Sequence, residues 1–529
     1  MMRKFLPALG LAASLSACAH SPVPLQIAAP EPAPAIDYDA EALRTMAAYD
    51  TTGMVVSVMV NGEVVHLGAY GLAEEGTDRP VTTDMRFPIA SISKAFTATA
   101  LGILVDRGQV DWDAPIRTYI PEFGMYDPWV SERFTVRDAL THRSGLPLGA
   151  GDLLIWPDGD ASPEDVIAAL PHLRPTTGFR DGYAYDNLLY VVAGEIVERV
   201  SGQDWATFVT SEILQPIGLD GCAAQQDRIA PGTPVVTGHE RAAGAGAGVP
   251  VDERLEFSET WSAAGGLYCT AGDMLDWAQF WFDRGVTEDG TRVLSEAQVE
   301  EILTGVTPVD VPGLHRNAGS SHLALYGLGW FVQDYEGTLM VRHSGGAPGV
   351  VSSLVLLPEH EIAVFASSND YRSAASAFTY HVAEALVADQ PRDVIGLMGT
   401  SFAAAEAEGA ALISGDAGRP ENPAPPSLPL SAYVGTYRDP WYGEVRITQN
   451  AEGALVIDMG RSEILDGPLT HHAGDRFAAF WPDASLKADA FVDFAVQDGT
   501  VVRVTMVAIS ELTDFSYDFH DLRLERVAE

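Results

Sequence analysis

The stretch Phe87-Pro88-Ile89-Ala90-Ser91-Ile92-Ser93-Lys94 leads into a helical pattern that reaches Asp106, and Gly108 is the expected stop. Residues three apart on a helix share one face, so Ser91 and Lys94 can meet. A serine hydroxyl becomes a good nucleophile only when a neighbouring base takes its proton. A buried lysine can be that base, because burial lowers the pKa of an amine from its reference of about 10.4. The stretch therefore predicts a nucleophilic serine paired with a lysine.

A second motif, Tyr185-Asp186-Asn187, stands directly before a helical pattern that runs from Leu188 to Val200. A tyrosine at this place can relay a proton, and an asparagine amide can hold both a substrate carbonyl and a lysine. On its own, a triplet of this kind is more often a turn before a helix. The triplet therefore indicates a catalytic site only together with the other motifs.

A third motif, Arg342-His343-Ser344-Gly345-Gly346, precedes the apolar strand pattern Ser353 to Leu357. Glycines beside a strand let a substrate backbone approach closely, and the N–H of Gly346 can face the serine as an oxyanion donor. Taken alone, the motif is a glycine-rich turn with an exposed histidine. The weight lies in the combination of the three motifs.

In this order and wide spacing the motifs resemble the serine β-lactamase and penicillin-binding-protein family, above all its class C β-lactamase, esterase and D-aminopeptidase branch. The resemblance covers roughly Ala40 to Asp389. Further stretches match the same family: Leu140-Thr141-His142-Arg143-Ser144-Gly145-Leu146, Ala263-Ala264-Gly265-Gly266-Leu267-Tyr268 and Tyr326-Gly327-Leu328-Gly329-Trp330. The resemblance implies an α/β (α+β) domain, with an antiparallel sheet flanked by helices, a mainly helical insertion, and the site in the groove between them.

The resemblance also implies a role for each motif residue. Ser91 is similar to the acylated nucleophile, and Lys94 to the partner that deprotonates it. Tyr185 is similar to the second proton shuttle, and Asn187 to the clamp on the substrate amide. The backbone N–H groups of Ser91 and Gly346 resemble the oxyanion hole. Whether Lys94 or Tyr185 is the general base stays open at this point.

One departure from the family concerns the substrate-binding positions His343 and Gly345. Strong β-lactamases of this branch carry Lys-Thr-Gly where this chain has His343-Ser344-Gly345. An ammonium that grips a substrate carboxylate is thus replaced by an imidazole, which is mostly neutral at pH 7 and is expected to charge below about 6.5. Arg342 would replace the charge only if its side chain pointed inward, and alternation along a strand argues against that. We therefore expect an esterase or peptidase rather than an efficient β-lactamase.

The N-terminus has the parts of a secretory signal: Met1-Met2-Arg3-Lys4, an apolar run from Phe5 to Leu15, and small residues after it. The apolar run is too short to span a bilayer. Leu15-Ser16-Ala17-Cys18 resembles the lipobox of bacterial lipoproteins, in which the cysteine is lipidated. The alternative is a plain signal cut after Ala19. We expect export to the periplasm and membrane anchoring through a lipid on Cys18.

Size and charge narrow the possible partners. At 529 residues the chain exceeds what one hydrophobic core usually serves, so at least two domains are expected. The formal net charge of -41 repels phosphate backbones and anionic headgroups. Nucleic acid is therefore not an expected partner, and the membrane is reached only through the N-terminal lipid. The expected substrate is a small ester or peptide.

Composition and turn signals divide the chain. Val56, Val58 and Val60 alternate with other residues before Asn61-Gly62, which predicts a hairpin. The expected segments are a lipoprotein signal peptide at 1–18, a Pro/Ala-rich tether at 19–37, the hydrolase domain at 38–395, a linker at 396–429 and a small all-β barrel at 430–529.

The C-terminal part contains short strand patterns punctuated by glycines. Its stretches Tyr433-Val434-Gly435-Thr436-Tyr437 and Trp441-Tyr442-Gly443-Glu444-Val445 resemble a lipocalin-like module often fused to these hydrolases. In some relatives that module packs near the active site or joins subunits, so a homo-oligomer through this domain is possible. We assign it no chemistry from sequence.

Three hypotheses about function remain. The leading one is hydrolysis of esters or peptides through an acyl-serine. The second is a D,D-peptidase or weak β-lactamase that acts on cell-wall peptides, and the third is a penicillin-binding sensor or scaffold without turnover. No Gly-x-Ser-x-Gly occurs, which disfavours an α/β-hydrolase esterase. No zinc pattern occurs and no cofactor or metal is expected, while Cys222 and Cys269 permit a disulfide without requiring one.

Overall fold

The computed structural model describes residues 36–240, 248–251, 259–413, 418–510 and 513–528. From Asp37 onward the chain packs as one compact unit. The expected signal peptide, Cys18 and most of the expected tether lie outside the described residues. Within them, no helix has both the length and the apolar character needed to cross a membrane.

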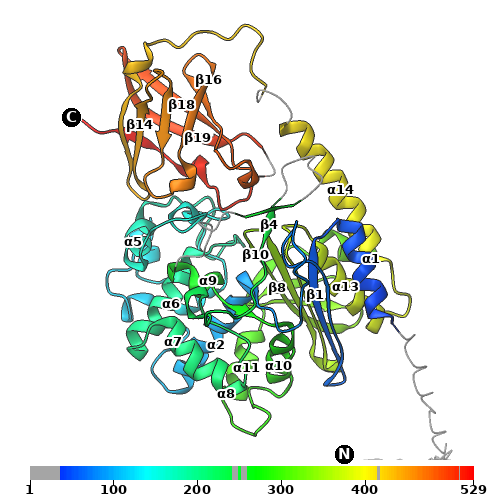
Figure 1. Cartoon of the computed structure of the whole chain (residues 1–529). Helices are drawn as coiled ribbons and strands as arrows, with labels where there is room; N and C mark the ends of the chain where they lie inside the picture. Colours follow the sequence, from blue (N-terminus) through cyan, green and yellow to red (C-terminus); the bar gives the residue numbers. More distant parts are fainter. Residues whose placement is uncertain (1–35, 241–247, 252–258, 414–417, 511–512, 529) are drawn as a thin grey trace, which may run out of the picture. The chain divides into compact units, whose positions relative to one another are not determined.

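An antiparallel sheet of eight strands, in the order β2-β1-β12-β11-β10-β9-β8-β7, forms the centre of the hydrolase domain (Figure 1). Its strands are β1 (Gly53–Val60), β2 (Glu63–Gly71), β7 (Thr307–Val309), β8 (Ala324–Tyr326), β9 (Phe331–Tyr335), β10 (Thr338–Ala347), β11 (Val350–Leu357) and β12 (Ile362–Ser368). The predicted hairpin at Asn61-Gly62 is confirmed, because β1 and β2 pair across it with both turn residues at positive φ.

Both faces of strand β1 are buried, whereas the edge strand β2 is largely exposed. On one face, Met54, Val56 and Val58 of β1 share a core with Phe378 and Val382. That face is covered by α1 (Tyr38–Tyr49) and α13 (Ala374–Val387). The other face packs against α10 (Ala271–Phe282) of the helical region. A strand covered on both faces is apolar at successive positions, which explains the run of valine and methionine in β1.

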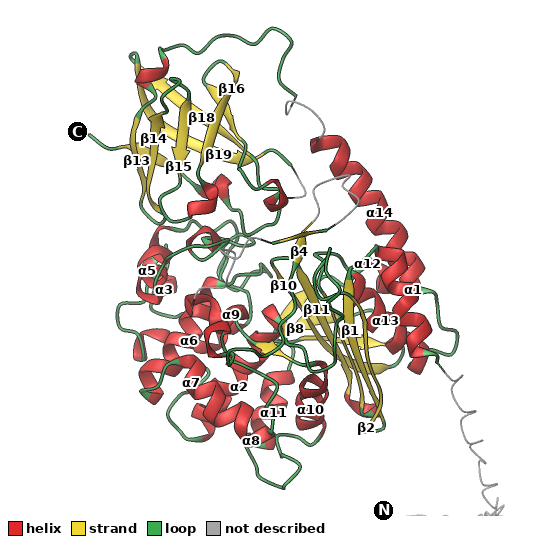
Figure 2. Ribbon diagram, in the orientation of Figure 1, coloured by secondary structure: helices red, strands yellow, loops and turns green. Residues whose placement is uncertain are grey.

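The helical region, at lower left in Figure 2, contains the helices that position the site. Its helices are α2 (Ser93–Asp106), α3 (Pro128–Ser131), α4 (Val136–Leu140), α5 (Pro163–Ala169), α6 (Leu188–Ser201), α7 (Trp205–Val209), α8 (Gln215–Ile217), α9 (Ser262–Gly265), α10 (Ala271–Phe282) and α11 (Glu296–Leu303). Helix α2 is buried from Ser93 through Leu104, so it is the central helix of this region. It ends as predicted before Gly108, whose φ is +68°.

The C-terminal domain is a closed barrel, as predicted. Its strands are β13 (Gly435–Asp439), β14 (Gly443–Gln449), β15 (Leu455–Asp458), β16 (Gly467–Ala473), β17 (Arg476–Ala479), β18 (Ala490–Gln497), β19 (Thr500–Ala508) and β20 (Leu524–Arg526). Buried side chains inside the barrel, such as Tyr437 and Val492, belong to the same apolar cluster as the helical region. The two domains therefore share a continuous core.

The expected linker at 396–429 needs a correction. Helix α14 (Val394–Ile413) occupies its first half. Alanine and glutamate favour a helix, and the prolines that prevent one begin only at Pro420. The first half of the helix is anchored, because Ile395 and Phe402 pack in one cluster with Tyr49.

Candidate active site

Ser91 lies on a tight turn between a strand and a helix. It belongs to the 3-10 turn η1 (Ala90–Ile92), which follows β3 (Phe87–Pro88) and precedes α2. Ala90 has a φ of +44°, a left-handed conformation that a residue with a side chain adopts only when its surroundings impose it. Strand β10 imposes part of it: a Cβ at Gly345 would lie 2.1 Å from the carbonyl oxygen of Ile89 and 2.9 Å from the amide nitrogen of Ser91. Gly345 thus brings β10 directly against the serine.

Lys94 lies at the centre of the site and is fully buried. Its Nζ donates hydrogen bonds to Ser91 Oγ at 3.1 Å, to Asn187 Oδ1 at 2.8 Å and to the carbonyl oxygen of Ala264 at 2.8 Å. Burial lowers the pKa of Lys94 to about 7, although the carboxyl groups of Asp152 and Asp186 act in the opposite direction. A large share of the amine is therefore neutral near pH 7 and able to accept a proton.

Tyr185 is the third motif residue in this cluster. The Lys94 ammonium nitrogen lies 4.7 Å from the centre of its ring. Burial raises the pKa of Tyr185 well above 10, and the interaction with the Ser91 hydroxyl opposes that rise. The phenol is thus protonated at neutral pH, which fits a proton donor or relay better than a first base.

Asn187 connects the lysine to two residues that the sequence did not single out. Its Nδ2 donates to Asp152 Oδ2 at 2.8 Å, and Ser516 Oγ donates to the same oxygen at 2.9 Å. Burial raises the pKa of Asp152 to about 8. Ser516 comes from the barrel domain, to which the sequence analysis assigned no chemistry.

His343 is buried and neutral. Its Nδ1 lies 2.6 Å from the carbonyl oxygen of Ser344, so this nitrogen carries the proton and donates it. Its Nε2 therefore accepts from the Tyr326 hydroxyl at 3.1 Å. Burial lowers the pKa of His343 to about 3. The expectation that the ring charges below about 6.5 is wrong, because that value applies to an imidazole in water.

Arg342 does not replace the missing charge. Its Nε donates to Gln333 Oε1 at 3.0 Å, and its guanidinium group stacks 4.7 Å from the ring centre of Phe331. Its side chain is not part of the cavity wall beside Ser91. Both contacts hold the Arg342 side chain against strand β9.

A cavity of about 230 Å³ opens at Ser91. Its wall contains the motif residues Ser91, Tyr185, Asn187, His343, Ser344 and Gly346. The aromatic side chains of Trp156, Trp261, Phe331 and Tyr371 also line it, as do Asp514, Phe515 and Ser516 of the barrel domain. Among these described residues, Asp514 is the only one with an ordinarily charged side chain. Gly346 is on the wall, but the oxyanion-hole roles of Ser91 and Gly346 stay a prediction.

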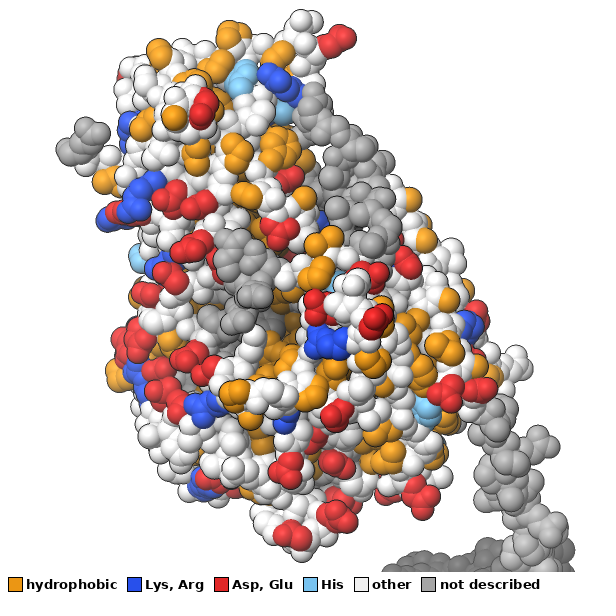
Figure 3. Space-filling view, in the orientation of Figure 1, with side chains coloured by type: hydrophobic (Ala, Val, Ile, Leu, Met, Phe, Trp, Pro, Cys, Tyr) orange, Lys and Arg blue, Asp and Glu red, His pale blue; other side chains and the backbone are white. Residues whose placement is uncertain are grey.

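The barrel segment approaches the motif residues closely. The ring of Phe515 lies 6.1 Å from that of Tyr185, and Asp514 Oδ2 accepts from the Tyr371 hydroxyl at 2.8 Å. Among the charged side chains on the face shown in Figure 3, acidic ones are more frequent than basic ones, in agreement with the net charge of -41. The described surroundings of the site thus favour neutral or cationic groups over anions.

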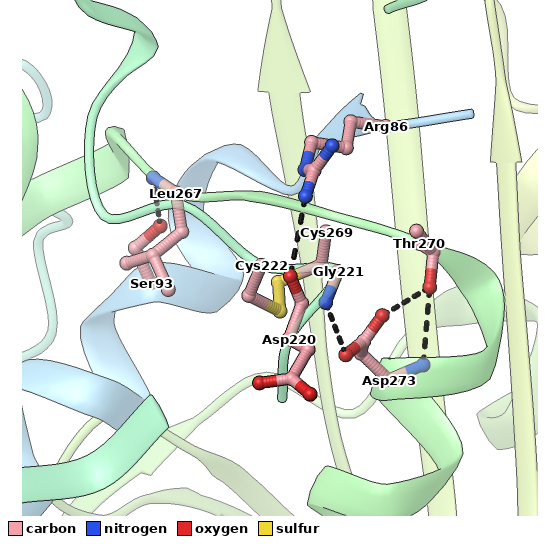
Figure 4. Close-up of a disulfide and its surroundings, with 9 residues drawn as sticks. All are labelled: Arg86, Ser93, Asp220, Gly221, Cys222, Leu267, Cys269, Thr270 and Asp273. Atoms are coloured by element: carbon pink, nitrogen blue, oxygen red, sulfur yellow. Dashed lines mark hydrogen bonds between the residues drawn. A yellow bond between two sulfur atoms is a disulfide. The ribbon is translucent and has the colours of Figure 1, made fainter. Parts of the chain in front are cut away.

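A disulfide joins Cys222 to Cys269 (Figure 4). Cys269 belongs to β6 (Tyr268–Cys269), which pairs with β3 just ahead of the nucleophile. The amide of Leu267 donates to Ser93 Oγ at 3.1 Å, a further contact between this strand and the start of α2. The disulfide therefore supports the strand against which the Ser91 turn is built.

In the described part of the chain, no group of three or more His, Cys, Asp and Glu side chains is placed to hold a metal ion. The expected absence of a cofactor stays a prediction.

Comparison with known proteins places the chain in a family. The family described as Beta-lactamase matches residues 39–389, and the family described as Domain of unknown function (DUF3471) matches residues 419–526. The chain belongs to the beta-lactamase family. It is a serine hydrolase, and the predicted α/β (α+β) fold with an antiparallel sheet and flanking helices is confirmed.

Three similar proteins illustrate how far the likeness extends. The Unguisins hydrolase ungD' of Aspergillus campestris is 27% identical over 78% of this chain and 77% of its own. Penicillin-binding protein 4 of Amycolatopsis lactamdurans is 29% identical over 60% of this chain and 80% of its own. The octameric penicillin-binding protein homologue from Pyrococcus abyssi has a TM-score of 0.59 at 20% identity, covering 89% of this chain and 97% of that one, and shows the fold alone.

Proposed function

We propose that this beta-lactamase-family hydrolase cleaves ester or amide bonds through an acyl intermediate on Ser91, with Lys94 as the first base. The observation that carries the proposal is the 3.1 Å contact between Nζ of the fully buried Lys94 and Ser91 Oγ, which opens onto the cavity. Burial lowers the pKa of Lys94 to about 7, whereas it raises that of Tyr185 well above 10. Of the two candidates, Lys94 is therefore the better acceptor of the serine proton.

The steps of the reaction follow from these positions. Ser91 Oγ attacks the substrate carbonyl carbon while its proton passes to Lys94. The N–H groups of Ser91 and Gly346 hold the resulting oxyanion, and Asn187 and Gly345 help to seat the substrate. The proton then returns through Tyr185 to the leaving alcohol or amine. In the second half, water attacks the acyl carbon and gives its proton to the base. The bond between the acyl carbon and Ser91 Oγ then breaks, Ser91 Oγ takes the proton from the base, and the acid is released.

The substrate class follows from the charge of the cavity wall. His343 is neutral, and no lysine or arginine is among the described wall residues, so nothing there matches a substrate carboxylate. A penicillin and the C-terminus of a cell-wall peptide both carry a carboxylate near the scissile bond. Their hydrolysis is the less favoured alternative, and small neutral esters and amides are favoured.

Intact-mass spectrometry tests this proposal. The purified protein is mixed with p-nitrophenyl esters, D-amino-acid amides and penicillins, with Ser91→Ala as the control. We expect a short-lived acyl adduct on Ser91 with esters or amides, and little or no adduct with penicillins. An adduct that persists with every compound would favour the sensor or scaffold hypothesis, and an adduct in the Ser91→Ala variant would exclude Ser91 as the nucleophile.

We also propose that the protein is exported and anchored by a lipid on Cys18. The basic start, the short apolar run and the Leu-Ser-Ala-Cys sequence support this. Fractionation of a bacterial host tests it: wild type should sediment with membranes, and Cys18→Ala should be released or left unprocessed. An unlipidated N-terminus beyond Ala19 would contradict the proposal. Assembly through the barrel domain also remains a proposal, which sedimentation of the purified protein checks.

A further inference from the structure

The barrel domain holds the turn on which Asp152 lies. This turn, η3 (Asp152–Leu154), follows Gly149 and Gly151, whose φ values are +69° and +79°. A Cβ at Gly149 would lie 2.6 Å from the ring of Phe515, so only glycine lets the two segments approach this closely. The amides of Gly151 and Leu153 donate to the two carboxyl oxygens of Asp518, at 2.7 Å and 3.1 Å. The barrel thus fixes the backbone on both sides of Asp152.

A chain of hydrogen bonds continues from the barrel to the lysine. Ser516 Oγ donates to Asp152 Oδ2 at 2.9 Å, and Asn187 Nδ2 donates to the same oxygen at 2.8 Å. Lys94 Nζ then donates to Asn187 Oδ1 at 2.8 Å. All of these residues are buried. The path from the barrel to Lys94 therefore consists of direct contacts.

The carboxyl group of Asp152 decides how the Asn187 amide is turned. Asp152 Oδ2 accepts a hydrogen bond from the amide nitrogen of Asn187, and this leaves the amide oxygen facing Lys94. The reversed amide would place its NH2 group against the lysine amine, which has protons of its own. Orientation of this amide therefore determines where the lysine nitrogen sits relative to Ser91.

We propose that Ser516 and Asp152 are positioning residues for the catalytic lysine, and that the barrel domain orients Lys94 toward Ser91 through Asn187. The inference rests on the proposed function, in which Lys94 is the base. It assigns the barrel a part in the chemistry of the hydrolase domain.

The charges around Lys94 give the inference a direction. The facing titratable groups are Asp152, Asp186, Tyr185, Tyr190, His142 and His343. The two tyrosines are neutral because burial raises their pKa values, and the two histidines are neutral because burial lowers theirs. The carboxyl groups of Asp152 and Asp186 are thus the groups that can place a negative charge beside the lysine.

Removal of the Ser516 hydroxyl should lower the pKa of Lys94. Hydrogen bonds from Asn187 and Ser516 lower the pKa of Asp152, which burial raises to about 8. Without the serine, the pKa of Asp152 rises and its mean negative charge falls. Asp152 then supports the charged lysine less, so the pKa of Lys94 falls. Asp152→Asn removes the charge altogether and should act in the same direction more strongly.

The experiment is the pH dependence of kcat/KM for a p-nitrophenyl ester, measured on the full chain. The variants are Ser516→Ala, Ser516→Thr and Asp152→Asn. Thr513→Val is the matched control in the same segment, because its hydroxyl donates only to the barrel's own Lys487 carbonyl among the described residues. Melting temperature is recorded for each variant.

We expect the acidic limb of the profile to move to lower pH in Ser516→Ala and further in Asp152→Asn. The maximal kcat/KM should fall about tenfold, as for the loss of a hydrogen bond to a charged group. Ser516→Thr keeps a hydroxyl and should stay near wild type, as should Thr513→Val. If Ser516→Ala does not fold, Ser516→Cys, a weaker donor of similar size, must move the limb in the same direction.

An acidic limb that stays in place in Asp152→Asn and Ser516→Ala would overturn the inference, whether or not the rate falls. An equal loss in Thr513→Val would indicate general loosening of the segment and would overturn it as well. The Ser91→Ala variant distinguishes failure of the proposed function from failure of this inference. Activity in Ser91→Ala would refute the proposed function. If Ser91→Ala is inactive and the acidic limbs of Ser516→Ala and Asp152→Asn do not move, this inference alone is refuted.

Discussion

The cavity at Ser91 has one wall from the helical region and one from the barrel, and the two differ in how firmly they are held. Lys94 is fully buried and Asn187 nearly so, on or beside the helices α2 and α6. On the barrel wall, Phe515 keeps 39% of its surface exposed. A buried side chain with every polar contact satisfied has one position, whereas a half-exposed ring can move aside.

This difference separates two tasks. The helical wall contains the groups that move protons, and burial shifts the pKa values of Lys94 and Tyr185. The barrel wall presents an aromatic ring and the carboxyl group of Asp514 to the substrate. We infer that the helical wall determines the chemistry and that the barrel wall contributes mostly to substrate choice. Ser516 is the exception, because its hydroxyl donates a hydrogen bond to Asp152 of the helical region.

Removing the nucleophile from the helical wall should have the largest effect on the rate of hydrolysis. Ser91→Ala should lower ester hydrolysis by roughly four orders of magnitude or more, the scale seen when a nucleophile is deleted. Turnover of a p-nitrophenyl ester measures it. Ser344→Ala is the control, because this exposed serine lines the same cavity without a base beside it. Activity of more than a few per cent in Ser91→Ala would show that another group attacks the substrate.

Shortening the barrel wall should have a smaller effect of a different kind. Phe515→Ala should raise KM about tenfold for esters with an aromatic acyl group, the free energy of one lost aromatic contact, and leave kcat nearly unchanged. Steady-state kinetics separates the two constants. Phe491→Ala, a barrel aromatic whose described ring contacts are with His472 and Arg476, should change neither. A large fall in kcat for Phe515→Ala would mean that the barrel wall also takes part in the chemistry.

A charge introduced at His343, on strand β10 of the sheet, should change substrate preference only several-fold. His343→Lys should raise kcat/KM for a penicillin relative to a neutral ester, because an ion pair in a partly wet groove is worth about 1 kcal/mol. Because burial lowers the pKa of His343 to about 3, wild type should keep its preference between pH 7 and pH 5.5. The ratio of the two specificity constants at both pH values measures this. A ratio that shifts in wild type on acidification would show that His343 does charge.

Loss of the disulfide should affect stability more than activity. Cys222→Ser with Cys269→Ser opens a link across 47 residues and should lower the free energy of unfolding by about 2–4 kcal/mol. Ester turnover at 25 °C should change least of all, because the pairing of β3 with β6 remains. Urea unfolding with and without reductant measures the change. The reductant should destabilise wild type and leave the double variant unaffected; equal curves for wild type would contradict the prediction.

Much of the helical wall could be predicted because its signals are local. Ser91 and Lys94 are three residues apart, and Asn187 directly precedes a helix whose pattern is clear. The hairpin at Asn61-Gly62 and most barrel strands also follow from turn residues and alternation. Strands β16 and β17 do not follow in this way, because Gly467-Pro468-Leu469-Thr470-His471-His472 has no strong strand pattern.

The barrel wall could not be predicted, since no local pattern connects residues so far apart. Asp152 and Ser516 are 364 positions apart, and neither belongs to a motif. Asp152 follows Gly149 and Gly151, which in the sequence indicate only a loop. The structure shows why Gly149 is needed, because Phe515 packs directly against it. Helix α14 was missed for another reason: low-complexity alanine sequence suggests a spacer, and only the packing of Phe402 on Tyr49 shows otherwise.

The long separation between Asp152 and Ser516 also has a meaning for the newly made chain. A ribosome that adds about 5–20 residues per second needs roughly 20 to 70 s to travel from one to the other. Throughout that interval Ser91 and Lys94 are already part of the nascent polypeptide, but Ser516, which donates the hydrogen bond to Asp152, has not yet been added. The late arrival of Ser516 would thus delay full activity until nearly all of the barrel has been made.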